Sequence, residues 1–66
     1  MKTIEAREIK VGMRFFNQAT LQEVVKIISI TEKAITFTTN RISPDYYEGG
    51  FFNRKRLGTK IEIINV

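Results

Sequence analysis

The sequence predicts an all-β protein: a small antiparallel five-stranded barrel with a short N-terminal helical turn and one long loop over residues 40–50. Two observations support this fold class. Short apolar segments rich in β-branched and aromatic residues alternate with polar breaks of turn length, which is typical of small all-β folds. The 66 residues also suffice for only one domain, spanning 1–66. A chain of this length buries about 60% of the surface that its unfolded form exposes, so the stability margin is small.

Residues 3–10 form the only segment with a helical pattern. Thr3 can serve as the N-cap, and Glu5 then lies in the first turn, where the helix dipole favours an anion. Isolated helices of fewer than about 12 residues are marginal in water. We therefore expect a single turn, held by Ile4 and Ile9, that covers one end of the barrel.

The first two strands are expected at residues 11–16 and 21–30, separated by the polar break at 17–20. Gly12 suits a turn or bulge at strand entry. Met13 and Phe15 share one face of the first strand, and Arg14 and Phe16 share the other. In the second strand neither face is cleanly polar, which predicts a bent strand whose inward face changes midway. A helix is the alternative there, but the β-branched pairs favour an extended chain.

The clearest alternation lies in residues 34–39, where Ile35 and Phe37 are expected inward and the intervening threonines outward. We therefore expect residues 24–39 to form a β-hairpin. The long loop over 40–50 contains a Pro-Asp turn signal. The glycine pair at its end leads into residues 51–57, and a turn at Gly58 precedes the last strand, 60–66, with Ile61 and Ile63 inward.

The phrase from Glu8 to Phe15, Glu-Ile-Lys-Val-Gly-Met-Arg-Phe, resembles the entry strand of Src-homology-3-like and Tudor-like barrels. Over most of the chain, the lengths and spacing of the expected strands are similar to those of these barrels. The resemblance implies a barrel fold and no particular function. The chain has no tryptophan, which the members that bind proline-rich peptides use, and no evident four-aromatic cage of the kind that binds methyl-lysine. An OB-fold is possible but usually needs more residues.

The composition argues against catalysis. The chain has no histidine and no cysteine, so the usual general base, the thiol nucleophile and thiolate zinc ligands are missing. Gly49-Gly50 precedes a strand and not a helix, which excludes the usual phosphate loop. We expect no enzyme activity, no metal and no cofactor. The N-terminus lacks an apolar signal segment and no apolar run approaches about 20 residues, so we expect a soluble, cytoplasmic protein without membrane contact.

Positive charge is concentrated near the C-terminus. Residues 51–66 contain four cations and one anion, a surplus of +3 out of the net charge of +4. Cations attract phosphates and exposed aromatic rings stack on unpaired bases. The sequence therefore predicts a nucleic-acid contact, DNA or RNA, at the following residues: Arg54, Arg56, Phe52 and Lys55, with Lys60 on the last strand and Arg41, Tyr46 and Tyr47 on the long loop.

Strict alternation in this stretch creates a conflict. Phe51 and Leu57 would lie in the core, Phe52 would be exposed beside an outward ladder of Arg54 and Arg56, and the polar residues at 53 and 55 would be forced inward. We therefore expect a bulge or an early strand end near residues 53–55, or exposure of that face at the barrel rim.

A protein–protein interaction module is the competing hypothesis. The basic strand would then bind an acidic protein surface, as in a small phage- or plasmid-type accessory or inhibitor protein, or the chain would form a homodimer. Its support is a surplus of apolar surface, expected at Phe16, at Ile28 or Ile30, and at Ile64. Edge pairing through 34–39 or 60–66 would be one route, and the basic strand could equally be a charged edge that prevents aggregation.

Overall fold

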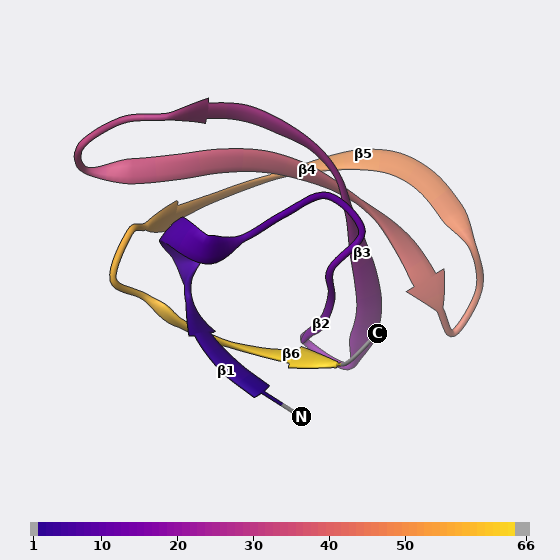
Figure 1. The fold of residues 1–66 in the computed structure, drawn as a ribbon. Helices are drawn as coiled ribbons and strands as arrows, with labels where there is room; N and C mark the ends of the chain where they lie inside the picture. The colour runs from indigo at the N-terminus through magenta and orange to yellow at the C-terminus, as the bar shows by residue number, and fades with distance from the viewer. Residues whose placement is uncertain (1, 65–66) are drawn as a thin grey trace.

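The computed structural model describes residues 2–64, which form one antiparallel sheet of six strands (Figure 1). The order across the sheet is β1-β6-β2-β3-β4-β5. The elements are β1 (Lys2–Glu5), the 3-10 helix η1 (Ala6–Glu8), β2 (Arg14–Asn17), β3 (Thr20–Ile30), β4 (Ala34–Ser43), β5 (Tyr47–Arg56) and β6 (Lys60–Ile64). The predicted all-β class is confirmed.

The sheet curls around a core drawn from nearly every element, because its inward faces carry the apolar residues. Phe37 and Ile35 are fully buried on β4, and the Phe37 ring meets that of Phe15 edge-on with centroids 6.1 Å apart. The alternation predicted for β2, β4 and β6 is therefore confirmed. The core consists of Ile4, Ala6, Ile9, Phe15, Val24, Ile35, Phe37, Ile61 and Ile63, with Met13, Ile27 and Leu57 packed against it.

The bend predicted for the second strand is also confirmed. The register of β3 against β4 shifts between Leu21 and Gln22, between Val24 and Lys26, and between Ile27 and Ser29. Gln22 and Val24 are buried before the second shift, whereas Ile27 is the half-buried residue after it. Each bulge adds twist and bend to the strand that carries it, and this one long strand turns the sheet over the core.

The N-terminal segment is a strand followed by a single helical turn. β1 pairs with β6 from Lys2↔Ile63 to Glu5↔Lys60, so Thr3 lies in a strand and is not the N-cap. Glu5 is the N-cap of η1 and forms a capping box with Glu8. Backbone N–H groups of η1 donate to Thr59 O (2.8 Å) and Leu57 O (3.1 Å), which fixes the turn over the β5–β6 connection.

Three further expectations need correction. The sheet has six strands instead of five, and among residues 2–64 no ladder joins its edge strands β1 and β5, so the sheet is open and the expected closed barrel is not observed. The prediction of a long loop over residues 40–50 is also wrong. β4 runs on to Ser43 and β5 begins at Tyr47, with Arg41 paired to Tyr47, because neighbouring strands complete the hydrogen bonds of this segment.

The edge strands of the sheet, β1 and β5, are not the segments that were expected to pair with a second chain. Residues 34–39 lie on β4, between β3 and β5, and β6 lies between β1 and β2. Residues 35–39 are already paired on both sides and cannot receive a further strand, whereas within residues 2–64 β6 pairs with β2 only at Ile63 and Ile64. Asn65 and Val66 of the predicted last strand lie outside the described residues. No helix among residues 2–64 has the length and apolar character needed to cross a bilayer.

The β2–β3 hairpin turn supports a first prediction. Gln18 and Ala19 connect the Asn17↔Thr20 pair and both have positive φ, 51° and 66°. Such two-residue turns favour Asn-Gly, because a β-carbon is strained in the left-handed region. We expect Ala19→Gly to raise the free energy of unfolding by about 0.5–1 kcal/mol. Gly12→Ala, at a glycine with φ of +96°, should lower it. Urea denaturation measures both, and destabilisation by Ala19→Gly would contradict the assignment.

Candidate functional site

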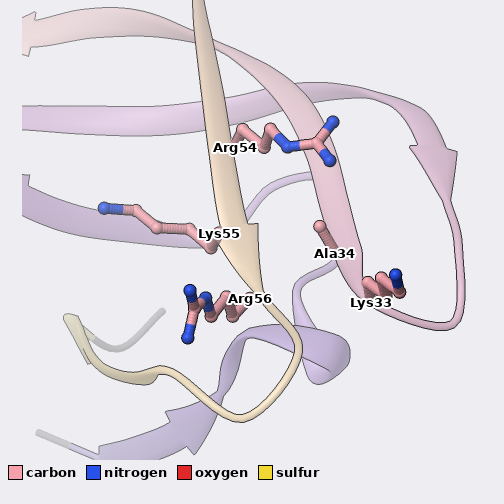
Figure 2. A pocket seen from close by; sticks show the side chains of 5 residues that line it. All are labelled: Lys33, Ala34, Arg54, Lys55 and Arg56. Carbon is pink, nitrogen blue, oxygen red and sulfur yellow. The ribbon is translucent and has the colours of Figure 1, made fainter.

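A group of cations surrounds the end of β5 (Figure 2). An open depression of about 610 Å³ is lined by Lys33, Ala34, Arg54, Lys55 and Arg56. We call Lys33, Arg54, Lys55 and Arg56 the basic cluster. Lys33 comes from the turn between β3 and β4, which brings it beside the end of β5 because Ala34 pairs with Arg56. Within residues 2–64, no member of the basic cluster makes an ion pair.

The two arginines do not form the simple ladder that the sequence predicted. Figure 2 shows the Arg54 and Arg56 side chains extending in different directions from β5, with Lys55 directed away from Arg54. The basic cluster therefore surrounds the strand end and presents charge on more than one side.

The conflict at residues 53–55 is resolved by exposure at the sheet edge. The β4–β5 ladder continues without a shift from Thr39↔Phe51 to Ala34↔Arg56, so the alternative of a bulge in this stretch is wrong. Asn53 and Lys55 lie on the inward face but stay half-exposed, because β5 is an edge strand.

A chain of hydrogen bonds satisfies Asn53. Its Nδ2 donates to Thr39 Oγ1 (3.1 Å), and the Thr39 hydroxyl donates to Gln22 Oε1. Gln22 Nε2 then donates to the hydroxyl of Thr20 (3.1 Å). Thr39 is fully buried and Gln22 is 7% exposed, so this chain carries polar groups through the interior from β5 to β3.

The outward face of the sheet adds an aromatic ring and a further cation. Phe52 is 75% exposed, as predicted. It pairs with Thr38, which pairs with Lys26 on β3, so directly opposed residues place all three in one row. Arg54 pairs with Thr36 in the next row. This outer face therefore presents an exposed ring on β5, with Arg54 two residues along the same strand and Lys26 in the same row two strands away.

Sequence analysis missed both Lys26 and Lys33. Neither is near the basic stretch in sequence, and only the strand register brings them beside it. For Lys26 the available signal was the outward Thr38, since the residues that oppose it on both neighbouring strands must share its face. For Lys33 the signal was its place in the predicted turn of the hairpin over residues 24–39.

The predicted loop residues lie at the other end of β5, where the β4–β5 hairpin turns. Arg41, on β4, is held by Asp45 through Nη2–Oδ1 (3.3 Å) and through its Nε–H to the Asp45 carbonyl (3.2 Å). Its guanidinium carbon lies 5.4 Å from the centroid of the Tyr47 ring, and that ring lies 5.8 Å from the Phe51 ring. We call Arg41, Tyr47 and Phe51 the tip cluster.

Phe51 is thus not a core residue. Its side chain is 36% exposed and packs on Tyr47, because the hairpin extends beyond the region that the core covers. Tyr46 is separate from the tip cluster. Its hydroxyl accepts from Asn40 Nδ2 (3.4 Å) and donates to Glu48 Oε2 (3.2 Å), so a carboxylate lies beside it.

Lys60 is occupied by an internal ion pair. Its ammonium donates to Glu5 Oε2 (3.4 Å), and the Arg7 guanidinium lies 2.8 Å from Glu5 Oε1. The hydrogen bond from Lys60, together with the charges of Arg7 and Lys60, lowers the pKa of Glu5 below its ordinary value. A lowered pKa in the folded state means that these contacts favour folding above the unfolded-state pKa and lose their effect as pH falls through the folded-state value.

The acidic residues offer no metal site within the described chain. Over residues 2–64, no three carboxylates come together in a way that could hold a cation. Comparison with protein-family models, with curated proteins and with solved structures finds no match for this chain.

Proposed function

We propose that the protein is a non-enzymatic nucleic-acid-binding protein, and that the basic cluster with the outer face of β3–β5 is its contact surface. The observation that supports this most is the concentration of four cations around one strand end without a carboxylate lining the same depression. Exposed cations bind phosphates and release counterions. Lys26, from β3, extends the positive charge across the face.

Phe52 supports the same proposal. A phenylalanine that is 75% exposed contributes little to the core, yet its position on the same face and strand as Arg54, with Lys26 two strands away in the same row, suits base stacking near phosphate contacts. Such a surface binds by charge and stacking and needs no cofactor.

The test is fluorescence anisotropy with a labelled single strand and a labelled duplex over a salt series. We expect log K to fall linearly with log salt. Arg54→Ala with Arg56→Ala should weaken binding at low salt and reduce the slope for the single strand by about 1.4, since each lost phosphate contact contributes about 0.7. A slope unchanged in this variant would contradict the proposed surface, and no binding at low salt would contradict the function.

The matched control is Lys2→Ala with Lys10→Ala. This variant also lowers the net charge from +4 to +2, because it removes two cations. Both lysines are exposed and lie outside the depression. It should keep most of the wild-type slope. If both double variants reduce the slope equally, the binding depends on net charge and not on the basic cluster.

A protein-interaction role remains the second candidate, favoured by one observation. Among the strands of residues 2–64, β5 pairs only with β4, so within this part of the chain its other edge is open to an extended segment. Exposed Phe16, Ile28 and Ile30 add apolar surface as the sequence predicted, whereas Ile64 is half-buried. Sedimentation of the full chain separates the two roles: a monomer at high concentration that binds oligonucleotide supports the first, and a dimer without oligonucleotide binding supports the second.

A further inference from the structure

The tip cluster has the construction of a preformed stacking surface. A β-carbon at Gly49 would lie 2.6 Å from Phe51 Cζ and 2.7 Å from Tyr47 Cε2, so the two rings close over this glycine. Arg41 contacts Tyr47 and is itself fixed by Asp45. Rings ordered in this way lose little freedom when a further planar group stacks on them.

These rings contribute little to the core. Tyr47 is 54% exposed, and neither Tyr47 nor Phe51 belongs to the core cluster. Two ordered, exposed aromatic residues and a guanidinium at one hairpin tip form the combination on which nucleobases stack, through ring faces and the planar cation.

We infer that the tip cluster is a second contact for the same ligand, where unpaired bases stack on Tyr47 and Phe51, so that the ligand is a single strand that follows β5 from its tip to the basic cluster. This inference rests on the proposed function. A base pair within a duplex cannot offer its face to a ring, whereas an unpaired base can. The tip cluster therefore selects single strands, and the basic cluster alone does not.

The geometry of β5 connects the two contacts. Phe51 and Arg54 are three residues apart on a regular ladder, a distance of about 10 Å along the strand. Phe51 and Phe52 are consecutive, so their rings project to opposite faces. Because no strand of the described residues covers the outer edge of β5, a single strand can cross that edge and place bases on both sides while its phosphates meet the cations.

The experiment compares oligothymidines of about 2 and about 12 nucleotides. At about 3.4 Å per nucleotide in a stacked strand, the shorter one is too short to join contacts about 10 Å apart, whereas the longer one lies within the range of single-strand site sizes. The wild-type protein should bind the longer strand more tightly than its number of phosphates accounts for. Tyr47→Leu with Phe51→Leu, which removes the rings and keeps apolar side chains, should weaken binding of the longer strand about tenfold and leave the shorter strand nearly unchanged. Tyr47→Phe keeps the ring and should retain wild-type affinity.

Two further measurements separate stacking from loss of structure. Gly49→Ala displaces the rings without removing them, and it should also lose the preference for the longer strand. The chain has two tyrosines and no tryptophan, so in a Tyr46→Phe background the fluorescence comes from Tyr47 alone. Stacking of a base should quench it during titration with the longer strand.

The outcomes distinguish this inference from the proposed function. If oligothymidine binds, Arg54→Ala with Arg56→Ala weakens it, and the ring variants change neither affinity nor Tyr47 emission, the second contact is wrong and the proposed function stands. Equal affinity for duplex and single strand in the wild type also overturns the second contact. If no oligonucleotide binds at low salt, both are wrong.

Discussion

Replacing Phe37 with alanine should lower the free energy of unfolding by about 3–5 kcal/mol, because the change removes a fully buried ring and leaves a cavity. Phe37 is the largest fully buried side chain, and it packs edge-on against Phe15 at the centre of the core. A domain of this length has a total stability of about 3–10 kcal/mol. The variant should therefore retain little folded population, as measured by circular dichroism in a urea titration.

Phe52→Ala is the matched control for this prediction. It makes the same chemical change on the next strand, at a side chain that is 75% exposed, and should alter the free energy of unfolding by less than about 0.5 kcal/mol. The comparison of the two variants thus distinguishes a core phenylalanine from a surface phenylalanine. If both variants lose stability equally, the inward face assigned to β4 and the outward face assigned to β5 are wrong.

Thr39→Val should destabilise the protein by about 1–3 kcal/mol, although the two side chains have nearly the same shape. The valine can neither donate to Gln22 Oε1 nor accept from Asn53 Nδ2, and Gln22 is too buried to find water instead. An unsatisfied buried acceptor retains its full desolvation cost. Urea denaturation monitored by circular dichroism is again the measurement.

Thr38→Val provides the comparison, since Thr38 is the next residue on β4 and lies on the outer, half-exposed face. It should be close to neutral. A double variant, Gln22→Leu with Thr39→Val, replaces both polar partners and should cost less than the sum of the two single changes. Equal stability of Thr38→Val and Thr39→Val, or strict additivity in the double variant, would contradict the buried hydrogen-bond chain.

The inward faces could be predicted from sequence because they depend on local alternation. Ile35 and Phe37 flank a threonine, and a period of two places both on one side of a strand wherever that strand lies. The absence of a cleanly polar face over residues 21–30 likewise predicted the bend in β3. Phe52 could be assigned to the exposed face for the same reason.

The errors concern pairing between distant segments. Asn40 and Arg41 have weak strand propensity, and only their partners Glu23 and Tyr47 extend the sheet through them. Thr3 was predicted to be a helix N-cap because its strand partner, Glu62, is far away in the sequence, so no local pattern indicates the pairing. The basic cluster was incomplete for the same reason, since Lys33 joins it through the Ala34↔Arg56 pair. The local sequence pattern indicates on which face of its strand a residue lies. The register between strands determines which residues of neighbouring strands lie side by side.

We propose that nucleic acid binds along β5, and amide NMR of the full chain during titration with oligothymidine at low salt tests this proposal most directly. We expect the largest chemical-shift changes along β5 and in the β3–β4 turn around Lys33, with β1, η1 and β6 nearly unaffected. Changes concentrated on β1 and β6, or spectra that do not change at low salt, would contradict the claim.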